Sequence, residues 1–368
     1  MFSKNGSPIK IFGDDRKKKY MQIAIELAEK GEGRVFPNPK VGCVIVKNGK
    51  VVGKGYHEYF GGNHAEINAL ASAGVNAKGS DMYVTLEPCN AYGKRPPCTR
   101  GIIKAGIKRV FAAVKDPNVL GSRKTLGKNG VEVHYGLLSK KAKKLIKDYF
   151  VHLKEKTNVS VKAAMTLDGK IATYNYDSKW ITSEKSRDYV HKLRSKYDAV
   201  LVGTNTAMKD NPFLTSHNKG RNPVRVVIDS KLKLPKNHHL LDGSVSTVVI
   251  YDENIKTIPQ YLKKDGIILA GVNMNAAKKD FKIIIDKLAG MSLKKILIEG
   301  GGDIISSSLF SNVVDDIYFF VAPKIIGGKD AVSVVGGKGV AKIKDAVNTK
   351  NMKVKKIGPD LLITGKLK

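Results

Sequence analysis

The sequence predicts two α/β domains joined near residue 157. Three observations predict this division. The chain has 368 residues, and a domain usually takes about 100–200. Short apolar strands alternate with helical patterns in both halves. A Lys-rich segment at helical spacing, 139–156, lies between them. We therefore expect domains at residues 14–156 and 157–368, and the absence of an internal repeat predicts that the two differ.

The first domain is expected to begin with a helix and a hairpin. Apolar residues recur at helical spacing between Asp15 and Gly31, which caps the helix. Val41–Val46 and Val51–Val52 flank Asn48 and Gly49, a pair typical of a type I′ turn. Further strands are predicted at Met82–Leu86, Val110–Val114 and Val131–Tyr135, with helices at Ala65–Ala73 and Thr99–Ala105, and a connecting helix at Ser139–Lys156.

In the second domain the alternation of strands and helices begins again. Apolar runs bounded by turn residues predict the strands, and polar–apolar periodicity predicts a helix at Glu184–Ser195. The predicted strands are Val159–Ala164, Ala199–Val202, Val224–Ile228, Thr247–Tyr251, Gly266–Leu269, Lys295–Ile298 and Asp316–Val321.

Charge and cysteine usage narrow the function classes. The formal net charge is +32, but only 10 of the 65 basic residues are Arg and the Lys are scattered. Specific nucleic-acid readers depend on Arg, so a compositional bias toward Lys explains the charge without a nucleic-acid partner. Three Cys cannot build a disulfide framework in a chain of this length. With no apolar stretch long enough for a membrane span, we expect a cytoplasmic protein.

A possible zinc centre is the strongest chemical signal in the first half. His64 and Glu66 open a helical run, while Cys89 ends a strand and Cys98 follows nine positions later. One His and two thiolates can hold Zn²⁺ and leave a fourth position for water. A carboxylate outside the ligand set, here Glu66, can move the protons, and this combination is the signature of nucleobase deaminases. The alternatives are a helix-capping His and two buried cysteines; Cys43 is assigned to the core.

Four motifs make the first half similar to a known family. PNPKVGCVIV, HAEINAL, VTLEPC and GKRPPC resemble the deaminase domain of the bifunctional deaminase/reductase family of riboflavin biosynthesis. The resemblance implies a cytidine-deaminase-like, three-layer αβα fold. It also implies that Asn38, His57 and Lys94 hold the substrate; judged alone, these would be a turn Asn, a surface His and a solvated Lys. Ala91 stands where the family usually has His, so the deaminase could be impaired unless Asn90 or Tyr92 compensates.

The second half resembles the reductase half of the same family. The motifs are VKAAMTLDGKIA, SKWIT, VLVGTNTAMKDNPFLT, IEGGG and APKIIGG, and they imply a dihydrofolate-reductase-like α/β fold. The physical pattern agrees at one place. A strand ends at Glu299, a Gly triplet follows, and a helix begins near Asp303, whose N-terminal amides suit the diphosphate of NADPH.

The resemblance also assigns binding residues in the second half. The cofactor would contact Ala164, Trp180, Thr206, Asp210, Ser230, Gly301, Gly302 and Asp303. The sugar phosphate of the substrate would contact Lys162, Ser178, Arg194, Leu214 and Glu299, with Lys162 and Asp210 positioning the ribose. The competing interpretations are a core Trp180, a turn-forming Asp210 and a surface Arg194. His217 replaces the usual family Arg, so phosphate binding could depend on Lys219 or Arg221.

Together these observations predict a bifunctional enzyme that uses Zn²⁺ and NADPH. The first domain would deaminate a phosphorylated ribosylamino pyrimidine, and the second would reduce its ribosyl chain to a ribityl chain. We expect a homo-oligomer with no specific nucleic-acid or membrane partner. Two alternatives stay open: a reductase whose deaminase is impaired by Ala91, and a basic nucleic-acid deaminase with a scaffold domain.

Overall fold

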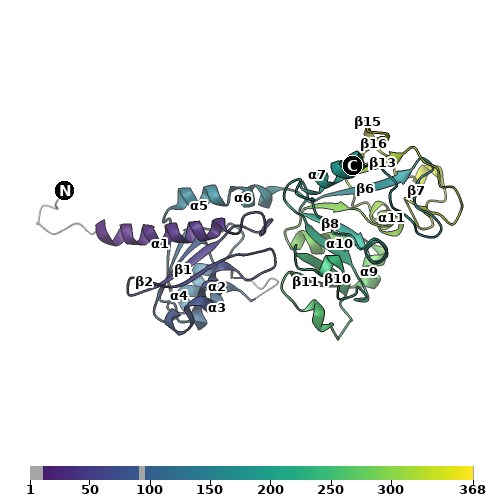
Figure 1. The fold of residues 1–368 in the computed structure, drawn as a ribbon. Helices are drawn as coiled ribbons and strands as arrows, with labels where there is room; N and C mark the ends of the chain where they lie inside the picture. Colours follow the sequence, from purple (N-terminus) through teal and green to yellow (C-terminus); the bar gives the residue numbers. More distant parts are fainter. Residues whose placement is uncertain (1–10, 91–95, 368) are drawn as a thin grey trace, which may run out of the picture. The chain divides into compact units, whose positions relative to one another are not determined.

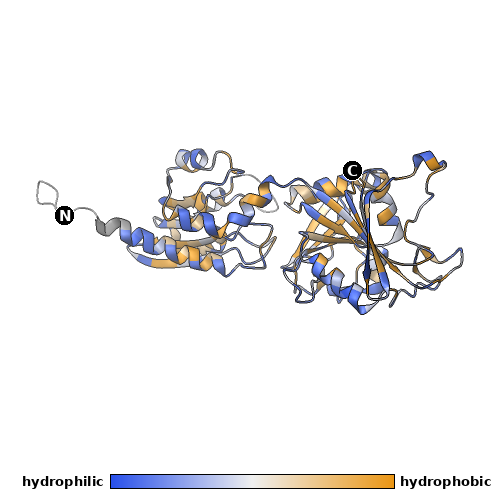
Figure 2. Ribbon diagram, turned by 90° about the horizontal axis from the view of Figure 1, so that it is seen from above, coloured by the Kyte–Doolittle hydropathy of each residue, from blue (hydrophilic) through white to orange (hydrophobic). Residues whose placement is uncertain are grey.

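The chain folds into two compact units, Met1–Lys154 and Glu155–Lys368 (Figure 1). The structure is a computed structural model that describes residues 11–90 and 96–367, with side chains from residue 15 onward. Each unit contains its own sheet and its own apolar core. Apolar residues concentrate in the strands, and polar residues cover the outer helix faces (Figure 2). We describe each unit by itself.

The first unit is built on a five-stranded sheet with the order β2-β1-β3-β4-β5. The strands are β1 (Gly42–Lys47), β2 (Lys50–Tyr56), β3 (Asp81–Leu86), β4 (Arg109–Val114) and β5 (Glu132–Tyr135). β1 pairs antiparallel with β2 and β3, whereas β3, β4 and β5 run parallel. The predicted type I′ hairpin is confirmed, because Asn48 and Gly49 both have positive φ.

Helices cover both faces of this sheet, which confirms the expected three-layer αβα fold. They are α1 (Ile11–Glu29), α2 (Ala65–Ala73), α3 (Cys98–Lys104), α4 (Ser122–Lys128), α5 (Ser139–Leu145) and α6 (Lys147–Lys154), with a 3-10 turn at Gly74–Ala77. α1 and α5 pack on one face, and α2, α3 and α4 lie on the other. A Cβ at Gly42 would lie 2.0 Å from the carbonyl oxygen of Ala24, so glycine is what allows α1 to approach β1 closely.

The second unit contains a nine-stranded sheet with the order β11-β10-β9-β8-β12-β6-β13-β16-β15. Its strands are β6 (Asn158–Thr166), β8 (Ala199–Gly203), β9 (Val224–Ile228), β10 (Thr247–Asp252), β11 (Ile267–Val272), β12 (Lys295–Ile298), β13 (Asp316–Ala322), β15 (Lys350–Ile357) and β16 (Asp360–Lys366). All neighbours from β11 to β13 are parallel, and β16 and β15 complete the sheet in antiparallel fashion. The parallel arrangement places the carboxyl ends of β6, β8 and β12 at one edge, where ligands bind in open α/β sheets.

Five helices and short elements complete this unit within the described residues. They are α7 (Glu184–Arg194), α8 (Thr204–Asp210), α9 (Met274–Lys279), α10 (Lys282–Gly290), α11 (Gly302–Phe310), the small sheet β7 (Lys170–Ala172) with β14 (Val332–Ser333), and 3-10 turns η2 (His239–Leu241), η3 (Gln260–Leu262) and η4 (Ile343–Asp345). β8 and β9 are buried along their whole length, as expected for parallel strands covered on both faces.

Two expectations about the elements need correction. The connecting segment was expected to form one helix over Ser139–Lys156, but it forms α5 and α6, because Ile146 leaves helical geometry at φ −108° while its side chain stays in the core. The strands β15 and β16 were not predicted at all. β15 is Lys-rich and exposed along almost its whole length, so it lacks the apolar run by which strands are recognised. No helix among the described residues has the length and apolarity to cross a bilayer.

Candidate active sites

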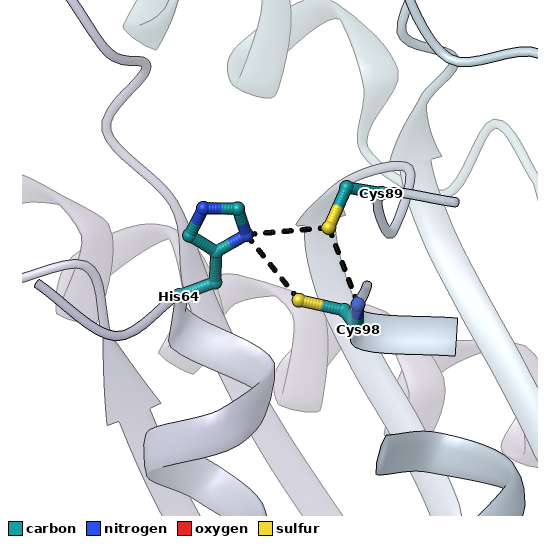
Figure 3. Close-up of side chains that lie close together, drawn as sticks. All are labelled: His64, Cys89 and Cys98. Carbon is teal, nitrogen blue, oxygen red and sulfur yellow. Dashed lines mark hydrogen bonds between the residues drawn. The ribbon is translucent and has the colours of Figure 1, made fainter. Parts of the chain in front are cut away.

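The three expected zinc ligands come from three separate elements of the first unit. His64 stands at the N-cap of α2, Cys89 follows the end of β3, and Cys98 is the first residue of α3. The helices α2 and α3 pack against each other, which brings residues far apart in the chain to one point (Figure 3).

The geometry of this cluster fits a tetrahedral metal. Nδ1 of His64 lies 3.5 Å from Sγ of Cys89 and 3.3 Å from Sγ of Cys98, and the three ligand atoms all lie within 4.8 Å of one another. Metal–ligand bonds of about 2.0–2.3 Å in a tetrahedral site separate neighbouring ligand atoms by roughly 3.5 Å. Two thiols and one imidazole are also the donor set that zinc prefers, so these residues can hold the ion.

The two thiols of the cluster share a hydrogen bond that lowers the pKa of Cys89 and raises that of Cys98. Hydrogen bonding to Cys98 and to His64 outweighs burial and lowers the pKa of the Cys89 thiol to about 4. The backbone N–H of Cys98 also donates to Sγ of Cys89 at 3.2 Å. Cys89 is therefore poised to be a thiolate. Cys43, by contrast, is completely buried and its pKa is raised by burial, which confirms its assignment to the core.

Glu66 lies where a proton carrier is needed. It sits in the first turn of α2, two residues after His64, and only 3% of its surface is exposed. Burial raises the pKa of its carboxyl group, although nearby His64 acts in the opposite direction. A carboxyl group with a raised pKa can both accept and donate a proton near neutral pH.

His57 and Asn38 form a bonded pair beside the cluster. Nδ1 of His57 lies 2.9 Å from the carbonyl oxygen of Asn63, which can only accept, so this nitrogen carries the proton. Nε2 of His57 then accepts from the Asn38 side chain at 3.1 Å. The rings of His57 and His64 pack edge to face, with their centroids 5.6 Å apart. His57 is buried, so the alternative interpretation of a surface His was wrong.

Sequence reasoning missed a buried support behind Cys89. Oε1 of Glu87 accepts from the Tyr135 hydroxyl at 2.8 Å, and Oε2 accepts from the backbone N–H of Asp116 at 3.3 Å. Tyr149 in turn donates to Asp116 at 3.1 Å. This network ties the end of β3, and thus Cys89, to β5 and α6. Its partners lie more than 25 positions apart, so no local motif could reveal it.

Part of the Cys loop lies outside the described residues, including Lys94, Ala91 and Tyr92. Asn90 is described, and both ends of its amide are engaged. Its Oδ1 accepts from the Thr99 hydroxyl at 3.1 Å, and its Nδ2 donates to the carbonyl oxygen of Leu120 at 3.1 Å. Asn90 therefore anchors the loop to α3 and to the segment after β4.

The second unit contains a cavity of about 670 Å³ at the carboxyl ends of its parallel strands. Most of the expected binding residues line it: Lys162, Ala164, Ser178, Trp180, Arg194, Thr206, Asp210, Leu214, Glu299 and Gly301. Lys179 and Arg187 add further positive charge to the lining. The size and the excess of basic groups suit phosphate-bearing ligands.

A buried charge cluster forms one wall of this cavity. Arg194 donates to Glu299 with both Nε and Nη2, at 2.7 and 3.0 Å, and Nζ of Lys162 lies 3.6 Å from the same carboxylate. Burial alone would raise the pKa of Glu299, but these two cations lower it to about 2. Burial lowers the pKa of Lys162. The Arg194 side chain is only 12% exposed, so the alternative of a surface charge was wrong.

Asp210 and Trp180 also line the cavity. Oδ1 of Asp210 accepts from the Ser178 hydroxyl at 3.1 Å, which joins two expected binding residues. Trp180 is 63% exposed, with the Arg187 guanidinium 4.3 Å from its ring centroid. Trp180 is therefore not a core residue, contrary to the alternative interpretation.

Three expected cofactor residues do not line the cavity: Ser230, Gly302 and Asp303. Ser230 follows β9, and the other two form the start of α11 as predicted. A Cβ at Gly302 would lie 2.5 Å from the carbonyl oxygen of Ser333, so this glycine allows close packing against the end of β14. Gly301, which does line the cavity, has a positive φ of 47°, a conformation that favours glycine.

His217 lines the cavity, and its ring lies 4.1 Å from that of His191. The two basic residues that could replace the missing Arg are engaged elsewhere. Lys219 pairs with Asp188 at 3.6 Å, and Arg221 donates to the carbonyl oxygen of Tyr197 at 3.3 Å. Neither is a lining residue.

Comparison with known proteins agrees with both sites. Residues 14–114 match the cytidine and deoxycytidylate deaminase zinc-binding region, and residues 157–363 match the RibD C-terminal domain. The RibD protein of Aquifex aeolicus is 41% identical over 355 residues, covering 94% of this chain and 97% of its own. The chain belongs to the RibD family. This membership decides against a separate nucleic-acid deaminase and makes the chain an enzyme with deaminase and reductase domains.

Other RibD proteins support the assignment over the same length. The protein of Bacillus amyloliquefaciens is 40% identical, with 94% of this chain and 95% of its own covered. The crystal structure of a diaminohydroxyphosphoribosylaminopyrimidine deaminase/5-amino-6-(5-phosphoribosylamino)uracil reductase from Thermotoga maritima is 36% identical, covers 96% of this chain and 99% of its own, and has a TM-score of 0.52. The RibD membership confirms the deaminase-like and dihydrofolate-reductase-like folds expected from the sequence.

Proposed function

We propose that the chain catalyses two consecutive reactions of riboflavin biosynthesis, the two that name its Thermotoga relative. Residues 14–156 would deaminate diaminohydroxyphosphoribosylaminopyrimidine, and residues 157–368 would reduce 5-amino-6-(5-phosphoribosylamino)uracil. The observation that carries this proposal is the convergence of His64, Cys89 and Cys98 next to a buried Glu66. The basic cavity in the second unit supplies the other half.

In the deaminase, His64, Cys89 and Cys98 would hold zinc, which when bound would supply a water activated for attack on the amino-bearing carbon. Glu66, buried two residues after His64, would take a proton from that water and pass it to the departing amine. The pair His57 and Asn38, beside the cluster, orients the pyrimidine. Lys94, from the loop between Cys89 and Cys98, also binds the substrate. Ammonia leaves and the pyrimidine carbon gains oxygen.

In the reductase, bound NADPH would supply a hydride for C1′ of the ribosyl group. The bond between C1′ and the ring oxygen would break as the oxygen takes a proton, which would leave an open ribityl chain. Lys162 and Asp210 position the ribose, and the remaining substrate contacts come from Ser178, Arg194, Leu214 and Glu299. The cofactor contacts are Ala164, Trp180, Thr206, Asp210, Ser230, Gly301, Gly302 and Asp303. Most of these line one cavity, which supports their joint use.

The substrate is therefore a small phosphorylated pyrimidine. We include in the proposal a cytoplasmic location and a homo-oligomeric assembly, of which the assembly is suggested by the family resemblance. Size-exclusion chromatography with light scattering tests the assembly, and a monomer at micromolar concentration would contradict it.

Two assays on one preparation of the zinc-loaded full-length chain test the function. Ammonia release from the diamino pyrimidine should be followed by NADPH oxidation when the cofactor is added. A matched control, Cys43→Ser, changes a cysteine outside the zinc cluster. Absence of both activities in folded, zinc-containing protein would refute the proposal.

Ala91 favours one second candidate, a reductase whose deaminase is impaired. Both ends of the Asn90 amide are already hydrogen-bonded, to Thr99 and to Leu120. Asn90 is therefore a poor replacement for the missing histidine, which supports this candidate. The variant Ala91→His should then raise ammonia release sharply without changing NADPH oxidation. Unchanged ammonia release would remove the idea.

A further inference from the structure

Two aromatic rings form a stack on the wall of the reductase cavity. The ring centroids of Phe213 and His239 lie 3.9 Å apart with an angle of 13° between the planes. Both residues line the cavity. Phe213 keeps 44% of its surface exposed, although large aromatic side chains usually gain stability by burial. The stack therefore presents apolar ring surface to the cavity.

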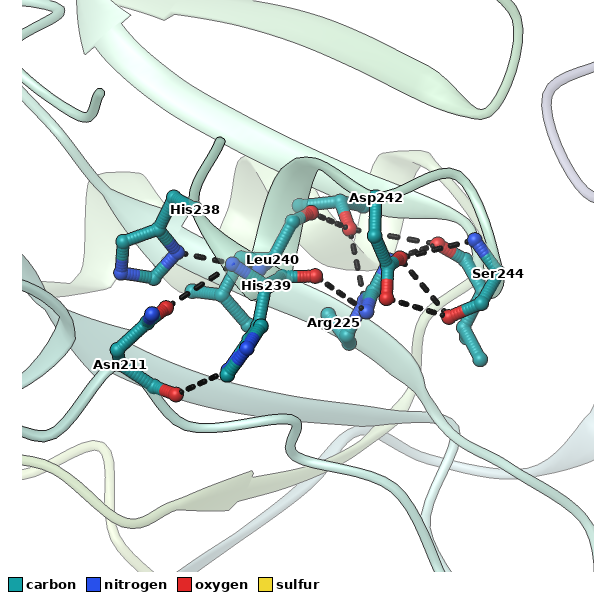
Figure 4. Close-up of polar contacts among 9 residues, drawn as sticks. Asn211, Arg225, His238, His239, Leu240, Asp242 and Ser244 are labelled. Atoms are coloured by element: carbon teal, nitrogen blue, oxygen red, sulfur yellow. Dashed lines mark hydrogen bonds and ion pairs between the residues drawn. The ribbon is translucent and has the colours of Figure 1, made fainter. Parts of the chain in front are cut away.

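The position of His239 is set by Asn211 (Figure 4). The backbone N–H of His239 donates to Oδ1 of Asn211 at 2.9 Å, and Nδ1 of its ring donates to the carbonyl oxygen of Asn211 at 2.7 Å. A carbonyl oxygen can only accept, so Nδ1 carries the proton. These two bonds fix both the backbone and the ring plane of His239.

A buried arginine also stabilises η2, the 3-10 turn that carries His239. Arg225 lies on β9, is completely buried, and donates to the carbonyl oxygen of His239 at 2.9 Å. It also pairs with Asp242 at 2.9 Å and donates to the Thr247 hydroxyl at 2.9 Å. Burial lowers the pKa of Arg225, and Asp242 opposes that effect. The cation is thus matched by partners in η2 and in the segment that follows it.

The neighbouring His238 adds two more hydrogen bonds that hold η2 in place. Its Nδ1 accepts from the backbone N–H of Leu240 at 3.1 Å, and its Nε2 donates to the carbonyl oxygen of Ala207 in α8 at 2.9 Å. η2 is therefore tied to α8, to β9 and to the turn at Asn211. A ring held this way loses little further freedom when a ligand binds, which is the advantage of preorganisation.

The place of Phe213 in the chain indicates which ligand it faces. It precedes Leu214, a lining residue, and the carbonyl oxygen of Thr215 accepts from Arg194 at 3.0 Å. The loop with Phe213 is thereby joined to the charge cluster around Glu299. A ligand whose phosphate or sugar lies at that cluster would bring the ring attached to its sugar within reach of Phe213.

We propose that Phe213, backed by His239, is a stacking platform for the pyrimidine ring of the reductase substrate. This inference rests on the proposed function. The recognised chemistry is a planar heteroaromatic ring, which stacks favourably on an aromatic side chain. The rings of NADPH share that chemistry, so the experiment has to separate the two sources.

The test compares Phe213→Leu, which keeps apolar bulk, with Phe213→Tyr, which keeps the ring. Phe310→Leu is the matched control, because Phe310 is 47% exposed at the end of α11 and does not line the cavity. The full-length chain has a single tryptophan, Trp180, which lies in this cavity, so its fluorescence reports ligand binding without turnover. The ligands are 5-amino-6-(5-phosphoribosylamino)uracil, NADPH, and ribose 5-phosphate as a sugar phosphate without a ring.

Phe213→Leu should weaken binding of the uracil compound and raise its KM roughly ten- to hundredfold, the range of ring stacking on an aromatic side chain. The KM for NADPH and the affinity for ribose 5-phosphate should stay within about twofold. Phe213→Tyr should restore binding, and His239→Leu should weaken it less than Phe213→Leu does.

Three results would overturn the assignment. A rise in the KM for NADPH alone would give the platform to the cofactor, an equal loss for ribose 5-phosphate would indicate general damage to the cavity, and unchanged binding in Phe213→Leu would remove the platform. The proposed function fails separately. If the wild-type chain bound the uracil compound in a Phe213-dependent manner but oxidised no NADPH, the platform would stand and the reductase proposal would fall.

Discussion

The buried carboxylate of Glu299 gives a prediction whose size follows from the structure. Its side chain is 4% exposed and contacts Arg194 at 2.7 Å and Lys162 at 3.6 Å. Burial raises its pKa, yet the two cations lower it from 4.5 to about 2. A pKa change of this size corresponds to about 3 kcal/mol. Removing one partner of a buried ion pair costs ~3–5 kcal/mol, so we expect Glu299→Gln to lower the free energy of unfolding by about 3–4 kcal/mol at pH 7.

The pH dependence of this loss has a definite sign. The pKa of Glu299 is lower in the folded state, so its stabilising contribution is fully present above about pH 4.5 and is lost as the pH falls toward 2. The difference between wild type and Glu299→Gln should therefore shrink to about 1 kcal/mol at pH 3.

Urea denaturation followed by Trp180 fluorescence measures this difference. The single tryptophan lies in the unit Glu155–Lys368, so the signal reports the unfolding of that unit. Glu253→Gln is the control, because Glu253 is exposed and a surface substitution usually changes stability by less than about 0.5 kcal/mol. A loss below ~1 kcal/mol at pH 7, or one that does not change with pH, would refute the reasoning.

Two further predictions concern the zinc cluster and the support of the aromatic stack. Glu66→Gln should keep its zinc but release ammonia about 10²–10⁴ times more slowly, because it lacks the proton carrier; NADPH oxidation on supplied uracil substrate is the internal control, and normal ammonia release would contradict the role. Arg225→Met should lower the free energy of unfolding of the reductase unit by about 1–3 kcal/mol, because the carbonyl groups of His239 and Val245 lose a buried donor, whereas the exposed Asp242 stays in contact with water. Urea denaturation checks this, and a change below about 1 kcal/mol would show that water replaces the guanidinium.

The zinc cluster was predictable from the sequence because its residue types are rare and its local spacings are short. The chain has three Cys, and two of them stand at strand and helix ends where side chains from different elements can meet. The motifs of the second half likewise assign Lys162, Arg194 and Glu299 to one binding site. What the motifs could not show was that Arg194 is buried and bound to Glu299 by two hydrogen bonds.

Other parts of the sites had no sequence signal. The exposed strand β15 lacks an apolar run. The pair Glu87 and Tyr135 joins residues 48 positions apart, and the stack of Phe213 on His239 joins a loop to a 3-10 turn. The sequence around each of these residues contains no motif. Their roles therefore become visible only from the residues that they contact in space.

By itself the sequence determined the two α/β units, the hairpin, the cluster of His64, Cys89 and Cys98, and part of the lining of the reductase cavity, because local periodicity and motif spacing can be identified along the chain. Only the tertiary structure decided which charges are buried and paired, as at Glu299, and which rings face a cavity, as at Phe213. The reason is that pKa values and stacking depend on distances of a few ångströms between groups that are far apart in sequence. Packing sets those distances.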